Sequence, residues 1–148
     1  MDVKKLQPEL TFEEGNIPYA YKDHLGYLTI GIGFLIDKNK GGRLYPEEIA
    51  FIFANRVSKI EAKLREKLPF FKDLDDARQR VLMQMAWQMG VEGLMQFVNT
   101  LKMVEQRNYQ GAAAGMLQSL WAKQTPDRAN RLSKMMATGI PPAQYGTV

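Results

Sequence analysis

The chain has 148 residues, a length typical of one domain with its own core. It contains no cysteine and a single histidine, His24, which excludes disulfides, a cysteine nucleophile and a multi-histidine zinc site and disfavours a Ser-His-Asp triad. The formal net charge of +4 favours an anionic partner but does not choose between a cell-wall polymer, a nucleic acid and a membrane surface.

No stretch of the sequence approaches 18 consecutive apolar residues, so no transmembrane helix is expected. The first eight residues, Met1–Pro8, include no apolar region of the kind found in secretion signals. The sequence therefore predicts a protein made in a cytoplasm without an ordinary secretion signal.

The first third of the chain predicts a short helix followed by a small β unit. The helix is expected over 6–14, and Gly15 stands where it would end. Asp23-His24-Leu25-Gly26 has the type I turn pattern, with Asp first and Gly fourth. Over Tyr27–Phe34, large apolar residues alternate with polar residues and glycines. This pattern predicts one strand with an apolar core face and a second, polar face that is nearly bare of side chains. The core face is expected to carry Leu28, Ile30, Ile32 and Phe34.

The remainder of the chain predicts helices. Apolar residues at helical spacing indicate a long helix from about Pro46 to Leu68, ended by Pro69. Further helices are expected at 75–89, 97–107, 110–123 and 126–136. The predicted class is α+β, mainly α, with a small N-terminal β-hairpin sheet, a long connecting helix and a C-terminal helical bundle.

Two carboxylates and a hydroxyl follow one another along the predicted helix, turn and strand. Contact with apolar surface at the helix end would raise the pKa of Glu14 and suit it to general acid catalysis. Asp23 opens the turn, and Thr29 shares the bare strand face with two glycines that leave room for a ligand. Such a set can hydrolyse a glycoside. The same residues also fit a solvated helix end, an ordinary turn residue and an ordinary strand threonine.

Three further features have alternative interpretations. Gly31-Ile32-Gly33 lacks the third glycine and the helix of a dinucleotide-binding loop. Tryptophan in a bundle helix, as at Trp121, is usually core but also stacks on sugars. A basic stripe at i, i+3 and i+6 is either a solvated face or a contact for an anionic polymer or lipopolysaccharide. This stripe consists of Arg128, Arg131 and Lys134.

Several motifs together resemble the phage T4-type lysozymes, the endolysins of glycoside hydrolase family 24, and the similarity runs from about Leu6 to Gly139. They are Glu14-Gly15, Tyr21-Lys22-Asp23, Gly26–Gly33, Leu74–Arg78, Trp87–Gly90, Phe97–Leu101 and Trp121–Ala129. The resemblance implies a lysozyme-like two-lobe fold in one domain, 1–148. In that fold 15–45 form the β lobe, 46–68 the connecting helix, and 6–14 with 69–148 the helical lobe.

The resemblance implies a muramidase that hydrolyses the β-1,4 bond between N-acetylmuramic acid and N-acetylglucosamine in peptidoglycan, with inversion. Glu14 would be the general acid. It is chosen over Glu13 because it directly precedes the glycine of the motif. Asp23 would be the base or electrostatic stabiliser, and Thr29 would hold the attacking water. Arg128 would hold the catalytic glutamate by charge. Residues at positions that line the family's glycan cleft are Leu35, Trp87, Gln88 and Thr100.

The resemblance also implies an enzyme that needs no metal or cofactor. The sequence contains no oligomeric signal, so a monomer is assumed, and no nucleic acid partner is expected. The enzyme would lyse a host cell from the cytoplasm once a holin breaches the inner membrane. Three alternatives are weighed: a lytic transglycosylase acting through one glutamate, a non-catalytic wall-binding module on the same fold, and membrane disruption by a cationic helix. The presence of Asp23 and Thr29 argues against the transglycosylase, and the intact set of Glu14, Asp23 and Thr29 argues against the binding module.

Three departures from the family pattern bear on stability and substrate preference. Phe34 stands where a histidine is common, and Gly115 lacks the polar side chain of a substrate-contacting position. The loop Asp37–Arg43 is shorter than in the T4-type enzyme, which is expected to open the cleft.

Overall fold

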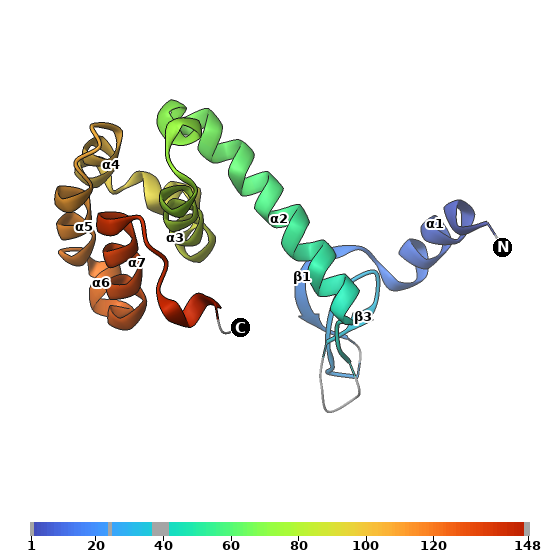
Figure 1. The fold of residues 1–148 in the computed structure, drawn as a ribbon. Coiled ribbons are helices and arrows are strands. Elements are labelled where there is room, and N and C mark those ends of the chain that lie inside the picture. Colours follow the sequence, from blue (N-terminus) through green and yellow to red (C-terminus); the bar gives the residue numbers. More distant parts are fainter. Residues whose placement is uncertain (1, 24, 37–41, 147–148) are drawn as a thin grey trace. The chain divides into compact units, whose positions relative to one another are not determined.

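The computed structural model describes residues 2–23, 25–36 and 42–146 (Figure 1). The backbone divides into two compact units, Met1–Phe53 and Ala54–Val148. Helices dominate, and one three-stranded antiparallel sheet lies in the first unit. This content confirms the predicted α+β, mainly α class.

The first unit begins with α1 (Val3–Glu14), whose two ends are set by its capping residues. The Asp2 carboxylate accepts the Lys4 N–H at 2.9 Å, which satisfies one of the unpaired donors of the first turn. At the other end Gly15 takes a φ of 77° and donates its N–H to the Thr11 carbonyl at 2.9 Å. The helix therefore ends where the sequence predicted, although it starts three residues before the predicted Leu6.

The sheet consists of β1 (Ile17–Lys22), β2 (Leu28–Gly31) and β3 (Phe34–Leu35), in that spatial order. The single strand predicted over Tyr27–Phe34 is wrong, because the chain turns at Ile32 and Gly33. Gly31 and Gly33 have φ values of 65° and 67°, a left-handed backbone that only glycine adopts at low cost.

The predicted faces of this strand are wrong as well. Thr29, assigned to the bare face, is 4% exposed, whereas Leu28 and Phe34, assigned to the core face, are exposed. After the turn Phe34 lies on β3 opposite Ile30, so the alternation does not run through it. A Cβ on Gly31 would lie 3.0 Å from Cδ2 of Phe34, so this ring packs over the glycine backbone.

The long helix α2 (Pro46–Lys67) matches the predicted 46–68 to within one residue. Glu48 Oε2 accepts the Tyr45 N–H at 2.7 Å, and acidic residues occupy the first turn, where they suit the positive helix end. Leu68 follows the helix, and a 3₁₀ helix then runs over Pro69–Asp73. No helix in the described part of the chain is long and apolar enough to cross a membrane.

The second unit contains α3 (Asp76–Met95), α4 (Val98–Glu105), α5 (Tyr109–Leu117), α6 (Leu120–Gln124) and α7 (Pro126–Thr138), followed by a 3₁₀ turn at Ala143–Gly146. The helix predicted to end at 89 is interrupted there, because Gly90 has a non-helical backbone, and a second helical segment of α3 continues to Met95. One break was not predicted. The helix predicted over 110–123 is two helices, because the Ser119 hydroxyl accepts the Ala122 N–H and starts α6.

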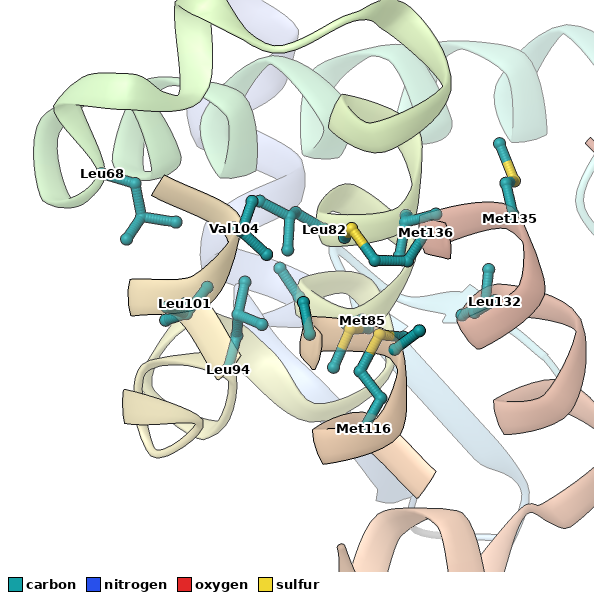
Figure 2. Close-up of a cluster of buried hydrophobic side chains, with 14 of the residues drawn as sticks. Leu68, Leu82, Met85, Leu94, Leu101, Val104, Met116, Leu132, Met135 and Met136 are labelled. Atoms are coloured by element: carbon teal, nitrogen blue, oxygen red, sulfur yellow. The ribbon is translucent and has the colours of Figure 1, made fainter. Parts of the chain in front are cut away.

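The hydrophobic core of the second unit lies among α3, α4, α5 and α7 (Figure 2). α5 packs against both α4 and α7, and α3 also packs against α7. Met85 is fully buried in this core, where its flexible side chain fills space between the helices. Other fully buried side chains of this core are Leu82, Leu94, Val104, Met116, Leu132, Met135 and Met136.

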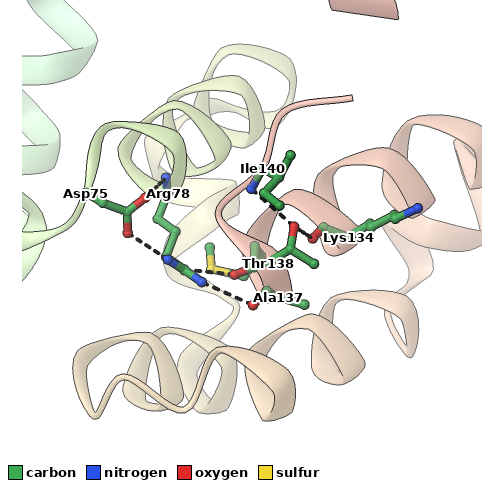
Figure 3. A network of polar contacts seen from close by, with 7 residues as sticks. Asp75, Arg78, Lys134, Ala137, Thr138 and Ile140 are labelled. Atoms are coloured by element: carbon green, nitrogen blue, oxygen red, sulfur yellow. Dashed lines mark hydrogen bonds and ion pairs between the residues drawn. The ribbon is translucent and has the colours of Figure 1, made fainter. Parts of the chain in front are cut away.

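Arg78 holds the end of α7 against the start of α3 (Figure 3). Its Nε donates to the Met136 carbonyl at 2.8 Å and its Nη2 to the Ala137 carbonyl at 3.1 Å. Its Nη1 lies 2.9 Å from Asp75 Oδ1, and its guanidinium stacks 3.6 Å from the centre of the Tyr109 ring. One side chain thus satisfies carbonyls left open at a helix C-terminus and joins three helices.

Candidate active site

Glu14 is the last residue of α1, and its side chain lies outside what the structure describes. Gly15 separates it from the first strand, in which Ile17 pairs with Gly31. The neighbouring Glu13 is exposed. The backbone therefore places Glu14 at the entry to the sheet.

Asp23 is half-buried in the connection from β1 to β2, and its carboxylate organises that connection. Its Oδ1 accepts the N–H groups of Leu25 and Tyr27, both at 2.9 Å. The Gly26 N–H donates to the Asp23 carbonyl at 2.9 Å, which is the hydrogen bond expected of the predicted turn. Within the described residues Oδ2 has no hydrogen-bond partner. One carboxylate oxygen thus orients the group, while the other remains available to accept a proton.

Thr29 lies in β2, the central strand, between Tyr21 of β1 and Leu35 of β3. Its Oγ1 donates to the Tyr27 carbonyl at 3.1 Å, which fixes the hydroxyl proton. The lone pairs of the oxygen can still accept a hydrogen bond from water or substrate. The sheet therefore brings Thr29 and Leu35 side by side, one short connection away from Asp23.

Trp87 and Gln88 lie on α3, just before the break at Gly90. The Trp87 side chain is 40% exposed, and Trp121 is buried on α6. The indole Nε1 of Trp121 donates to Gln88 Oε1 at 2.9 Å. Phe97 meets the Trp121 ring edge to face, with 6.1 Å between the ring centres. Trp121 thus serves the core with its ring and orients Gln88 with its N–H.

Arg128, near the start of α7, is half-buried and donates from Nη2 to the Gln84 carbonyl at 3.3 Å. Gln84 and Gln88 are one helical turn apart, so Arg128 and Trp121 meet the same face of α3. The other two residues of the basic stripe, Arg131 and Lys134, line a separate hollow of about 700 Å³ formed with Ile140–Pro142.

A second hollow of the helical unit, about 420 Å³ in volume, lies between the starts of α4 and α6 and contains the predicted Thr100. Its other lining residues are Gln96, Phe97, Val98, Asn99, Gly115, Gln118, Ser119, Leu120 and Trp121. Asn99 and Gln118 were not predicted as site residues, because isolated amides at helix ends have no periodicity that marks them.

The structure therefore gathers the predicted residues into two sets. Asp23, Thr29 and Leu35 share the small sheet, whereas Trp87, Gln88, Thr100 and Arg128 lie in the helical unit. Over the described ranges, no three His, Cys, Asp or Glu side chains are grouped so as to hold a metal ion.

The first unit supplies a turn with a fixed carboxylate and a buried threonine on a small sheet, and the second supplies helices with amides and tryptophans. These are features of a glycoside hydrolase of the lysozyme type. Residues 11–136 match the phage lysozyme family, and the chain belongs to that family. It is a lysozyme that degrades peptidoglycan.

Curated relatives agree with this assignment. The chain is 30% identical to "Probable T4-type lysozyme 1" of Dictyostelium discoideum over 93% of this chain and 96% of that protein. It is 34% identical to "Peptidoglycan hydrolase gp36" of Pseudomonas phage phiKMV over 98% of this chain but 16% of the relative. It is 29% identical to "Pre-baseplate central spike protein Gp5" of Enterobacteria phage T4 over 86% of this chain and 26% of that protein. Similar sequences thus occur both alone and within larger phage proteins.

Proposed function

We propose that this lysozyme is an inverting muramidase that hydrolyses the β-1,4 bond between N-acetylmuramic acid and N-acetylglucosamine. The observation that carries the proposal is the geometry of Asp23, whose Oδ1 accepts two backbone N–H groups while Oδ2 has no hydrogen-bond partner among the residues that the structure describes. The spacing of Glu14, Asp23 and Thr29 and the membership of the phage lysozyme family support it.

In the proposed reaction Glu14, as the acid, protonates the glycosidic oxygen while the bond from that oxygen to the anomeric carbon breaks. A water molecule attacks the anomeric carbon from the opposite face, and its proton passes to Asp23. Thr29 accepts a hydrogen bond from this water and orients it. An inverting enzyme holds its carboxyl groups roughly 6.5–9.5 Å apart, which leaves room for the water.

The remaining predicted residues would bind the glycan. The side-chain oxygen of Gln88 accepts the Trp121 N–H, so its NH₂ group is the part that can donate to a sugar. The exposed Trp87 ring offers a stacking surface, and Leu35 and Thr100 complete the contacts. Arg128 would hold Glu14 by charge. A monomer without metal or cofactor suffices for this chemistry.

A digest of purified peptidoglycan tests the reaction and its acid together. Wild type, Glu14→Gln and the matched neighbour Glu13→Gln are compared, and products are identified by mass spectrometry after borohydride reduction. We expect reducible muramic acid ends from wild type and Glu13→Gln and none from Glu14→Gln. Non-reducible 1,6-anhydro ends would identify a lytic transglycosylase, and no products from wild type would favour a wall-binding module.

The stereochemistry has a separate test. Proton NMR of the sugar ends, recorded within minutes of mixing, should show the α-anomer first, because inversion of a β bond yields α. An initial β-anomer would contradict the water-activating roles of Asp23 and Thr29 and would point to retention.

The biological role follows from the same proposal. The enzyme would lyse a host cell after release from the cytoplasm through a membrane breach, and the exposed Lys134 with Arg131 and Arg128 would contact lipopolysaccharide. The positive net charge and the phage relatives support this role. Expression in a bacterium with and without a pore-forming holin tests the route, and lysis only with the pore is expected.

A further inference from the structure

The end of α7 and the segment that follows it form a hollow of about 700 Å³, here called the α7 hollow. Its volume lies in the range of roughly 300–1,000 Å³ that is usual for sites of small ligands. Its lining includes Asn130, Arg131, Lys134, Ile140, Pro141 and Pro142. Among the described residues that line it there is no Asp or Glu, so two cations share the hollow without a compensating carboxylate.

The segment after α7 is held in place by local contacts. Gly139 has a left-handed φ of 70° and donates its N–H to the Met135 carbonyl at 2.8 Å, which ends the helix and turns the chain. The Thr138 hydroxyl accepts the Ile140 N–H at 3.1 Å (Figure 3). Further along, Tyr145 is partly buried against the core of the second unit. The α7 hollow is therefore a formed feature of this unit.

The two cations of the α7 hollow have no ionic partner in the part of the chain that the structure describes. Arg131 and Lys134 are one helical turn apart, and Asp127, one turn before Arg131, does not pair with it. By contrast, Arg78 and Arg80 of α3 are paired with carboxylates. Arg131 is partly buried, so its guanidinium has lost some hydration that an anionic ligand would replace.

The surroundings of these cations favour a peptide carboxylate over a membrane lipid. Leu132, Met135 and Met136 of α7 are fully buried in the core, so they cannot enter a lipid layer while the protein is folded. Beside the cations, Ile140 is 68% exposed and Pro141 is exposed as well. These two residues offer a small apolar surface, which suits a carboxylate flanked by small apolar groups.

We propose that the α7 hollow binds the carboxylates of a short acidic peptide and that the stem peptide of peptidoglycan is this ligand. The Arg131 guanidinium can hold a carboxylate through two N–H groups, and Lys134 adds a second charge. Stem peptides carry carboxylates close to alanine methyl groups, which match the apolar surface. The exposed Asn130 amide can pair with peptide groups. The inference rests on peptidoglycan as the substrate but not on the proposed bond, acid or stereochemistry.

The test is a binding titration followed by NMR of the ¹⁵N-labelled full chain. The probes are the free stem tetrapeptide, the same peptide with its carboxylates amidated, inorganic phosphate and purified lipopolysaccharide. The backbone signals of Gly139 and Ile140 report on the α7 hollow. We expect saturable shifts with the carboxylated peptide that weaken in high salt, and none with the amidated peptide.

Three results of this titration would overturn the proposal. The first is the absence of shifts with the carboxylated peptide. The second is a Kd for this peptide no lower than that for phosphate, which would describe a hollow for any anion. The third concerns lipopolysaccharide, proposed above as a contact of the basic stripe: shifts with it but not with the peptide would assign the hollow to a lipid.

Variants with one charge fewer identify the groups involved. Arg131→Gln and Lys134→Gln should each raise the Kd of the carboxylated peptide by about 3- to 10-fold, as loss of a partly exposed ionic contact does. Lys102→Gln removes an equal charge from α4, outside the lining of the hollow, and should bind like wild type. Equal losses in all three variants would show that net charge attracts the peptide and would overturn the proposal.

A variant that fills the α7 hollow separates a formed site from a charged surface. Ala143 is an exposed lining residue, so Ala143→Trp should occupy the space without removal of a cation. We expect it to lose most of the peptide binding, whereas an unchanged Kd would overturn the proposal. An unchanged Trp121 indole signal shows that each variant is folded. Because the probes are not cleaved, failure here would leave the Glu14 digest unaffected, and failure of the digest would leave this binding result unaffected.

Discussion

Asp23 shows how one carboxylate can serve the backbone and the chemistry at once. Its Oδ1 accepts two N–H groups of the connection between β1 and β2, a role that turns commonly assign to aspartate. The same bonds hold the carboxylate in one orientation at the start of β2, and in the described part of the chain Oδ2 accepts no hydrogen bond. A structural role therefore does not argue against a catalytic one, and substitutions can separate the two.

Asp23→Asn keeps an Oδ1 acceptor and removes the charge. We expect the free energy of unfolding to stay within about 0.5 kcal/mol of wild type, while kcat falls by roughly 10²- to 10⁴-fold, as for loss of a general base. Asp23→Ala should lose the same activity and in addition about 1 kcal/mol of stability, because the exposed Leu25 N–H and the partly buried Tyr27 N–H lose their acceptor. Denaturant unfolding and peptidoglycan turnover measure the two effects. An active Asp23→Asn would leave Asp23 as a turn residue.

At the scale of elements, Gly90 interrupts α3 two residues after Gln88. Its φ of 79° and ψ of 159° lie in a region that is almost exclusive to glycine. A Cβ there would meet no atom within 4 Å, so the requirement is conformational and not steric. The break redirects the chain while Trp87 and Gln88 stay on the helix.

Gly90→Ala should therefore destabilise the protein by about 1–3 kcal/mol through backbone strain alone. Binding of the glycan should weaken as well, since the strained segment is two residues from Gln88. Thermal unfolding and a binding titration check both effects. An unchanged Tm would show that alanine adopts this backbone and that the break has another cause.

The start of α3 combines a cap with an ion pair. Partial burial would raise the pKa of Asp75, but hydrogen bonds from the Arg78 side chain and backbone and the Arg78 charge outweigh it, so the pKa lies below its ordinary value of 3.8. A lowered pKa in the folded state means that unfolding takes up a proton in acid. The contribution of Asp75 is complete above the ordinary pKa and is lost as pH falls through the lowered one.

Wild-type stability should accordingly fall as pH drops below about 4, and Asp75→Asn should flatten part of that fall. The carboxylate is nearly half exposed, so the difference should be below about 1 kcal/mol. Urea unfolding between pH 5 and 2.5 measures it. Asp76→Asn, which removes an exposed partner of Arg80, is the matched control. A steeper decline in Asp75→Asn than in wild type would reverse the sign of this argument.

At the scale of the whole molecule, the buried apolar cluster belongs to the second unit. It begins at Leu64 and ends at Met136. Of the residues in the first unit whose burial the structure describes, Thr29 alone is buried. Helical packing in the second unit is therefore expected to dominate the stability of the chain.

Met85→Ala tests this expectation in the centre of the core. Removal of a fully buried methionine should lower the free energy of unfolding by about 2–5 kcal/mol. Leu120→Ala, at a side chain that is 68% exposed, is the control and should change it by less than about 0.5 kcal/mol. Equal effects of the two would show that the cluster does not control stability.

Much of the second unit could be predicted because helix boundaries depend on neighbouring residues. Prolines at 46 and 126 and the glycine at 139 mark ends that the structure confirms within two residues. The first unit was predicted less well, since the turn after Gly31 requires a left-handed backbone at Gly31 and Gly33 that the alternating pattern does not specify. The assignment of 6–14 to the helical lobe stays a prediction.

The candidate site also has a part that local sequence predicted and a part that it did not. Motif spacing singled out Glu14, Asp23 and Thr29, and the turn of Asp23 follows from residues within four positions of it. No local pattern indicated that Thr29 would be buried. The Trp121–Gln88 hydrogen bond joins residues 33 positions apart.

Sequence alone was thus sufficient for the family, the class of fold and the order of the helices, because caps, turns and periodicity act over a few residues. Burial, the pairing of distant side chains and the shape of the hollow were decided by the packing of α3 to α7. That packing depends on contacts between residues far apart in the chain, which no local pattern specifies.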